Sequence, residues 1–458
     1  MSLVIIVIMW SNASNGKCDI FATRNFFLGG VILFQSVSGA QTLLTGDTEG
    51  GAAVNDYRTP GLLFCIILTI FVVLFLALYR KFGFVERLAE RQTRIRVTTS
   101  SRLVLAGITL VLVGGVLRFA GARIPYVAIL LPQLAAGVLG GGVTLVAMAW
   151  ARSSFNLFIA AMLGVTLVGA AAVILVDAFG RRELVGILFS MVAGLYFEKW
   201  RWMPVTKLLP RAVIALSTLA AVVLIFSSSR TGGENVDRSL TQQLQRIREI
   251  DARSIQENIM AATSGQFAGG ISMWVIDARR ADAEYYPMHS LFYFATLPIP
   301  RNYWPGKPEG LGMTIVDQAG ISGVSEGHSW GPGLVGHLYN DIVFFSLPVY
   351  ALMLAAAFRY MDTRTLRSID DPVTIAIFGS ALGQVFGMPR GDLGLFAFNM
   401  LAAYSGVWIF GRLVAKVFLP IDREAELLDK EQGLGSLDDE YDDCPAMTER
   451  SGSHEQHA

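Results

Sequence analysis

Cysteine is nearly absent from this sequence. The 458 residues include three cysteines, Cys18, Cys65 and Cys444, which show no CxxC spacing, and five histidines, which form no cluster. Disulfide-stabilised domains and zinc sites need such residues in pairs or groups. The sequence therefore indicates neither a disulfide framework nor a zinc site.

Charged residues are also scarce. They make up 16% of the chain, whereas 53% of the residues are hydrophobic, and this imbalance is atypical of soluble domains. The formal net charge is zero, so the chain lacks the basic field that nucleic-acid binding requires. We expect no nucleic-acid partner.

Long apolar segments, in contrast, are abundant. Crossing a hydrocarbon core of roughly 30 Å takes about 20 apolar helical residues, and runs such as LLFCIILTIFVVLFLALY approach that length. In lipid such runs form helices, because the backbone has to satisfy its own hydrogen bonds. The sequence predicts an all-α fold, a polytopic integral membrane helix bundle of about eleven segments at residues 2–10, 25–44, 59–79, 103–119, 125–150, 154–176, 183–197, 211–228, 333–357, 372–389 and 393–419.

The first segment departs from the others. The opening MSLVIIVIMW is short for a spanning helix, and it has neither the basic start nor the small-residue cleavage site of a signal peptide. We expect it either to insert partially or to be the end of a helix that starts upstream.

Basic residues mark one side of the membrane. Lys and Arg are enriched in short cytoplasmic loops, and seven of them lie within residues 80–102, which we place in the cytoplasm. Counting crossings from there puts the basic residues near 199–211 and 359–367 on the same side. The same count places four other segments outside the cytoplasm: residues 46–58, 177–182, 229–332 and 390–392.

This count divides the chain into four parts. They are an N-terminal transmembrane bundle (1–228), a large extracytoplasmic loop (229–332), C-terminal transmembrane helices (333–419) and a disordered acidic cytoplasmic tail (420–458). Within the loop, apolar residues recur at three- to five-residue steps from Leu240 to Ile259 and predict an amphipathic helix. The Pro-interrupted run from Met288 to Ile299 predicts a re-entrant or interfacial piece.

Two short outer turns carry arginine. Arg181 and Arg182 lie in DAFGRRELVGILFS, and Arg390 lies with Asp392 in MPRGDLG. The simplest interpretations are flanking by snorkelling side chains for the first turn and mutual pairing for the second. Because positive charge is depleted from short outer loops, an anionic ligand is the alternative.

The large loop contributes two further candidate stretches. LPIPRNYWPGKPEGLG, residues 297–312, has three closely spaced prolines and presents Arg301 and Lys307 beside aromatic residues. SEGHSWGPGLVGHLYND, residues 325–341, contains His328, which can act as a base near neutral pH, and Asp341. A structural loop and a hydrogen-bonded structural histidine are the competing interpretations. Jointly, the four stretches place cations at the outer face, where a diphosphate-bearing lipid would suit them.

These stretches resemble a known family. GRRELVGILFS at a helix start, IPRNYWPGKPEGLG followed by GPGLVGHLYNDIVFF, and many helices around one large loop make the chain similar to oligosaccharide repeat-unit polymerases (O-antigen polymerases) and the related O-antigen ligases. The resemblance covers about residues 150–360. Family members carry periplasmic arginines, sometimes as Arg, ten residues and Gly. Arg301 and Gly312 match that spacing, whereas Val192 and Ala193 stand where Arg181 and Arg182 would need glycine.

The resemblance implies an inverting glycosyltransferase in a bacterial inner membrane, with the large loop in the periplasm. Such enzymes use polyprenyl-diphosphate-linked glycans in the lipid bilayer and need neither a metal nor another cofactor. A chain-length regulator and a flippase would be possible partners. In this sequence the expected catalytic residues are His328, Arg301 and Asp341, and the expected diphosphate ligands are Arg181, Arg182, Arg301, Lys307 and Arg390.

Two other functions remain as alternatives. A polysaccharide-pathway transporter would also have many helices, but transporters place polar sites near the bilayer midplane, and here the unusual residues gather outside. A membrane scaffold would use the outer loop only for protein contacts. The sequence also leaves open whether the acceptor is another lipid-linked unit, as for a polymerase, or a different molecule, as for a ligase.

Overall fold

The chain is almost entirely helical where the structure describes it. The computed structural model describes residues 19–46, 54, 56–89, 96, 98–121, 123–124, 130–153, 156–175, 181–228, 267–282, 287–319 and 329–421. Within these ranges β pairing is limited to one isolated antiparallel bridge, between Arg96 and Ile421. The predicted all-α class is confirmed for this part of the chain.

Seven helices among the described residues are long and apolar enough to cross a membrane. All seven coincide with predicted segments, so a helical membrane protein is confirmed by length and composition. They are Thr23–Thr45 (α2 Thr23–Gly30, the π-helix η1 Val31–Val37 and α3 Ser38–Thr45), α4 Arg58–Lys81, α6 Ser100–Gly121, α7 Leu130–Arg152, Leu157–Ile174 within α8 (Leu157–Leu175), α17 Val343–Arg367, and Leu393–Phe418 (α19 Leu393–Gly406, the π-helix η5 Val407–Gly411 and α20 Arg412–Phe418).

The other predicted segments have different outcomes. Helices α9 (Arg181–Glu198) and α10 (Val205–Ser228) occupy the predicted segments 183–197 and 211–228 but are not among the seven. Helix α18 (Pro372–Gly387) is apolar but shorter. Segment 2–10 lies outside the described residues. The total of eleven therefore stays a prediction.

The predicted single helix 333–357 is divided in two. Helix α16 (Gly333–Asn340) ends before Asp341, and α17 begins at Val343. Between them Ile342 has a φ of 63°, which a β-branched residue rarely adopts. The Ser346 hydroxyl, in the first turn of α17, donates to the carbonyl oxygen of Leu338 at 2.6 Å. This bond holds the start of α17 against α16.

Small residues bring the central helices close together. A Cβ on Gly383 of α18 would lie 2.4 Å from the Cα of Gly186 on α9, and a Cβ on Gly194 of α9 would lie 2.6 Å from the carbonyl oxygen of Thr144 on α7. Such contacts between small residues are the usual means by which membrane helices pack. Helices α7, α9 and α18 thus form the centre of the larger core cluster.

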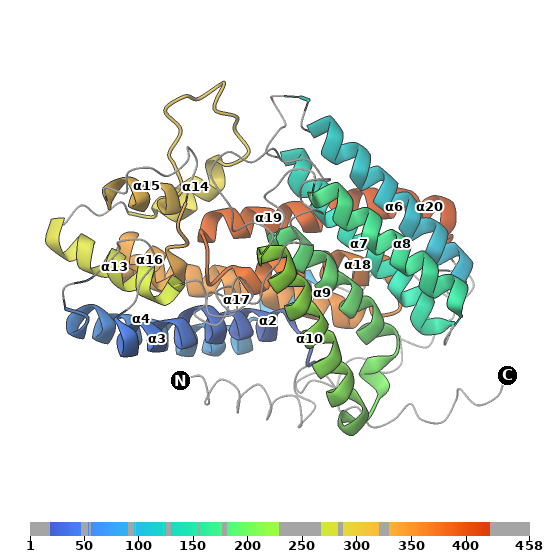
Figure 1. Ribbon diagram of the computed structural model, residues 1–458, viewed down its shortest axis with the longest axis horizontal. Helices are drawn as coiled ribbons and strands as arrows, with labels where there is room; N and C mark the ends of the chain where they lie inside the picture. Colours follow the sequence, from blue (N-terminus) through green and yellow to red (C-terminus); the bar gives the residue numbers. More distant parts are fainter. Residues whose placement is uncertain are drawn as a thin grey trace.

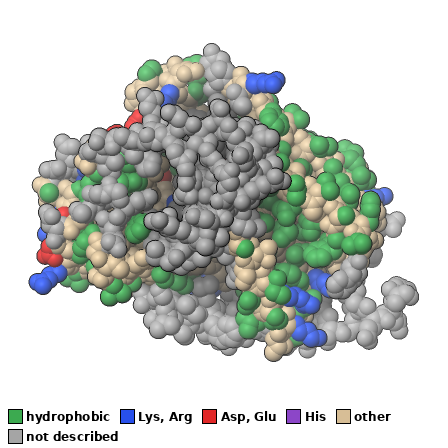
Figure 2. Space-filling view, viewed as in Figure 1, with side chains coloured by type: hydrophobic (Ala, Val, Ile, Leu, Met, Phe, Trp, Pro, Cys, Tyr) green, Lys and Arg blue, Asp and Glu red, His purple; other side chains and the backbone are tan. Residues whose placement is uncertain are grey.

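The periphery is apolar. Large exposed hydrophobic side chains lie along α6 and α8, among them Leu112, Val116 and Val168. Figure 2 shows hydrophobic side chains over the part of the molecule where Figure 1 places α6, α7 and α8. Exposed apolar area of this extent suits lipid rather than water.

Part of the predicted large loop packs on the bundle. Residues 267–319 contain α13 (Ala268–Asp282), α14 (His289–Thr296) and α15 (Leu311–Gln318). Helix α13 contacts α3, α4 and α16, and α14 contacts α19 (Figure 1). The run 288–299, predicted to be re-entrant or interfacial, forms the short helix α14 and the turn after it. The amphipathic helix predicted within 240–259 lies outside the described residues.

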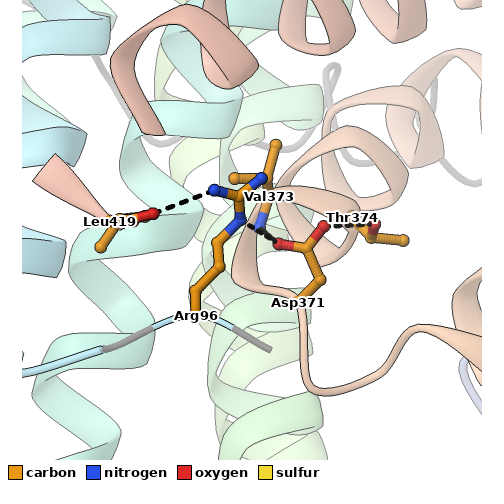
Figure 3. Close-up of polar contacts among 5 residues, drawn as sticks. All are labelled: Arg96, Asp371, Val373, Thr374 and Leu419. Carbon is orange, nitrogen blue, oxygen red and sulfur yellow. Dashed lines mark hydrogen bonds and ion pairs between the residues drawn. The ribbon is translucent and has the colours of Figure 1, made fainter. Parts of the chain in front are cut away.

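At the end of the bundle opposite to α13–α16, ion pairs join residues 80–102 to residues near 359–371. Figure 3 shows Arg96, whose Nε lies 3.0 Å from Asp371 Oδ1 and whose Nη1 donates to the carbonyl oxygen of Leu419 at 2.9 Å. Asp371 also caps α18 by accepting a hydrogen bond from the backbone N–H of Val373. Three further ion pairs are partly buried: Arg152–Glu198, Arg201–Asp19 and Arg359–Glu86.

Candidate functional site

The loop 297–312 is held by its own cations. Lys307 is buried, and its ammonium donates to the carbonyl oxygens of Leu297 at 3.0 Å and Ile299 at 2.9 Å, just after α14. Burial, and secondly the charge of Arg301, lower the pKa of Lys307. Lys307, predicted to bind diphosphate, therefore directs two of its three N–H groups into the loop.

Arg301 is more exposed. Its Nη1 donates to the carbonyl oxygen of Lys307 at 3.2 Å, and its Nη2 lies 3.4 Å from Glu309 Oε1. The side chain is nevertheless 46% exposed. The five N–H groups of a guanidinium exceed these contacts, so Arg301 presents donors at the surface of the loop.

Three of the four predicted stretches meet in space. A Cβ on Gly310, in the loop 297–312, would lie 2.6 Å from Asp392 Oδ2. A Cβ on Gly331, in the stretch 325–341, would lie 2.6 Å from the carbonyl oxygen of Arg390, and the backbone N–H of Leu334 donates to Pro389 at 2.9 Å. We call this contact region, residues 297–312, 329–334 and 388–393, the convergent end.

Gly312 belongs to the same contact. A Cβ there would lie 2.2 Å from the carbonyl oxygen of Trp330, and the Trp330 N–H donates to the Gly312 carbonyl oxygen at 3.0 Å. This close approach of two backbones requires glycine. The glycine at position 312 thus has a structural reason in this chain.

In the fourth stretch, DAFGRRELVGILFS, the side chain with a described ion pair is that of Glu183. Arg181 and Arg182 are the first residues of α9, and their side chains lie outside what the structure describes. Glu183 pairs with Arg118, which is 5% exposed, at 3.3 Å, and Arg118 also donates to the carbonyl oxygen of Pro132. Sequence analysis missed Arg118. Its signal would have been a single arginine near the outer end of an apolar segment.

Asp341 lies at the break between α16 and α17 and is fully buried. Its Oδ2 accepts from the backbone N–H of Ser290 at 2.9 Å and from the Tyr350 hydroxyl, and its Oδ1 accepts from Asn340 Nδ2 at 2.9 Å. Asn340 in turn accepts from Arg279 Nε of α13 at 2.8 Å. Both oxygens of Asp341 are bonded within the protein. His328, the other predicted base, lies outside the described residues.

His337 is a buried histidine that was not predicted. The Nδ1 of His337, on α16, lies 2.5 Å from Ser290 Oγ on α14, and its Nε2 accepts from the backbone N–H of Leu393 on α19 at 3.1 Å. Because Nε2 is an acceptor here, the neutral ring carries its proton on Nδ1 and donates to Ser290. This arrangement is the reverse of a catalytic Ser–His pair, in which the ring accepts the serine proton.

His289 and Tyr293 of α14 border the convergent end. Burial is the largest cause that lowers the pKa of His289, and the charge of Asp341 opposes it. Burial and then the charge of Asp392 raise the pKa of Tyr293, whereas Arg301 lowers it. The Tyr293 phenol is therefore influenced by groups from both the loop 297–312 and the turn at 388–392.

The described residues contain no group of three or more His, Cys, Asp or Glu side chains placed to hold a metal ion. Comparison of the chain with protein families, curated proteins and solved structures finds no match. The resemblance to O-antigen polymerases therefore rests on the sequence stretches quoted above.

Proposed function

We propose that the protein is a bacterial inner-membrane glycosyltransferase that joins polyprenyl-diphosphate-linked oligosaccharide repeat units into a surface polysaccharide. The observation that carries the proposal is the convergent end, where stretches far apart in the sequence meet beside an apolar bundle. A substrate with a lipid tail and a diphosphate needs an apolar bundle and nearby cations together.

The cations have different roles in this proposal. Arg301, with donors at the loop surface, is the principal diphosphate ligand, because a guanidinium binds phosphate oxygens in a bidentate manner. Lys307 supports the loop through the carbonyl oxygens of Leu297 and Ile299. Arg390 follows Pro389, which is bonded to Leu334, and lies in the turn before α19. Arg181 and Arg182 remain candidate ligands at the start of α9.

Transfer to a different acceptor, as in an O-antigen ligase, would use the same donor chemistry and remains the second candidate. A transporter is less well supported, because the predicted diphosphate ligands Arg301, Lys307 and Arg390 lie at the convergent end. In this proposal the loop faces the periplasm. A chain-length regulator and a flippase are possible partners of the protein.

Arg301 provides the test. In a bacterium that lacks its chromosomal copy, we expect the Arg301→Ala variant to be inserted and abundant but to make no extended polymer. Arg301→Lys should restore it partly, because lysine is a point charge without the planar fork. Arg280→Ala is the matched control, since Arg280 is an exposed arginine near the end of α13. Wild-type polymer length in Arg301→Ala would contradict the proposal.

A further inference from the structure

Asp392 differs from Asp341 and Glu309. Asp341 has both oxygens bonded, and Glu309 pairs with Arg301. Asp392 is partly exposed and forms no ion pair with any described residue. Its side chain accepts one hydrogen bond, from the backbone N–H of Leu395 to Oδ1 at 3.3 Å, and so caps α19.

The second oxygen of Asp392 points toward the loop. Oδ2 lies 2.6 Å from the place that a Cβ on Gly310 would occupy, and the Tyr293 ring lies 3.2 Å from the same place. The absence of a side chain at Gly310 thus leaves this oxygen facing the loop that carries Arg301. With one oxygen fixed by the helix cap and the other without a hydrogen bond to any described residue, this carboxylate has a defined direction for accepting a proton.

We propose that Asp392 is the general base of the glycosyl transfer, and that the acceptor hydroxyl approaches its partly exposed side chain where the loop 297–312 meets the turn at 388–392. This inference rests on the proposed function. The acceptor oxygen forms a bond to the anomeric carbon of the donor sugar as the bond from that carbon to the phosphate oxygen breaks. The electron pair of the broken bond leaves with the polyprenyl diphosphate. The hydroxyl proton passes to Asp392 Oδ2 and then to water, and no redox step occurs.

The geometry favours Asp392 over Asp341, which the sequence suggested as a possible base. Asp341 is fully buried and bonded to Ser290, Asn340 and Tyr350, so an acceptor hydroxyl could reach it only if these groups moved, and leaving such buried groups unpaired is costly. Asp392 requires no such rearrangement. Arg301 lies on the same loop as Gly310, where it would stabilise the leaving diphosphate as charge develops.

The test uses full-length protein in lipid vesicles with a polyprenyl-diphosphate-linked oligosaccharide as donor. The Asp392→Asn variant keeps the size of the side chain and an oxygen that can cap α19 but loses the charge. We expect its single-turnover transfer rate to fall about 10²–10⁴-fold while donor binding is unchanged. The matched control is Asp317→Asn, an exposed aspartate on α15, which should transfer at the wild-type rate.

Two further variants keep the proposal testable if Asp392→Asn folds poorly. Asp392→Ser retains a capping hydroxyl and leaves space, so added formate should restore part of its transfer rate. Gly310→Ala places a methyl group against Oδ2, and we expect slower transfer with an intact protein. Wild-type rates in Asp392→Asn, or a defect confined to donor binding, would overturn the role of Asp392. No transfer by the wild-type protein would instead contradict the proposed function itself.

Discussion

His337 joins three helices with one imidazole ring. Through Ser290 it contacts α14, through its own backbone it belongs to α16, and through the Leu393 N–H it holds the start of α19. These are the helices that carry or flank the loop 297–312 and the turn at 388–392. We therefore expect this residue to matter first for stability, and through stability for the site.

Replacing His337 by alanine would leave two buried groups without their partners, the Ser290 hydroxyl and the Leu393 N–H. Each such loss costs about 1–3 kcal/mol, so the melting temperature of the detergent-purified protein should fall clearly. Ser380→Ala is the control, because the Ser380 hydroxyl is buried but bonds only the Ile377 carbonyl oxygen of its own helix. Equal melting temperatures for the two variants would show that the His337 bonds contribute little.

The burial of His289 predicts that the stability of the folded protein depends on pH. Burial lowers its pKa from the usual 6.5, so the folded protein takes up this proton less readily than the unfolded chain. Stability should therefore fall as the pH drops below about 6.5, because the unfolded state then binds more protons. Comparing melting temperatures from about pH 7.5 to about pH 5.5, we expect a smaller decrease for His289→Gln than for the wild type. The same decrease in both would exclude His289 as its source.

The sequence singled out the loop that carries Arg301 and Lys307, but it could not give the geometry of the candidate site. Arg301 and Lys307 were visible as candidates because they lie beside aromatic residues in a stretch with three closely spaced prolines. His337 and Ser290 looked like ordinary residues of apolar stretches. Their pairing spans 47 residues of sequence, and no local pattern encodes a contact of that length.

At the scale of elements, the lengths of the apolar runs predicted most helices but missed the break between α16 and α17. The run from Gly333 onward is continuous in composition, so it predicted a single helix. The break at Asp341 depends on bonds from Ser290 and Tyr350, which the sequence pattern does not contain. The π-helix Val31–Val37 was missed for a similar reason, since Gln35 donates to the distant Pro389 carbonyl oxygen at 2.7 Å.

The contact between α9 and α18 gives a prediction at this scale. A methyl group on Gly383 would meet the backbone of Gly186 at 2.4 Å, so Gly383→Ala should force the two helices apart. Overpacking of this kind costs about 1–3 kcal/mol. Gly169→Ala on α8 is the matched control, because nothing lies within 4 Å of its Cβ position. Measured by thermal unfolding in detergent, a loss of stability confined to Gly383→Ala supports this packing, whereas equal stability would contradict it.

At the scale of the whole molecule, the distribution of basic residues along the sequence and the packing of the helices group the same segments together. The basic segments that the sequence placed in the cytoplasm are joined by ion pairs such as Arg96–Asp371 and Arg359–Glu86. The convergent end lies at the opposite ends of the helices. This agreement concerns which segments lie together, and the orientation in the membrane stays a prediction from the positive-inside rule.

Cysteine labelling tests the orientation. In a chain with Cys18, Cys65 and Cys444 replaced by serine, we expect Asn302→Cys to react with a membrane-impermeant maleimide from the periplasm. Asp370→Cys, in the exposed turn before α18, should react only after the inner membrane is permeabilised. The opposite pattern would reverse the assigned sides and place the convergent end in the cytoplasm.

The most direct test of the central claim is glycan transfer by the purified protein in lipid vesicles. With a polyprenyl-diphosphate-linked oligosaccharide as the sole donor and acceptor, the account predicts a ladder of longer lipid-linked glycans. It also predicts release of polyprenyl diphosphate, without an added metal or nucleotide sugar, and loss of both products in Arg301→Ala but not in Arg280→Ala. Unchanged donor after prolonged incubation, or movement of donor across the bilayer with no new glycosidic bond, would contradict the claim that the convergent end is a glycosyltransferase site.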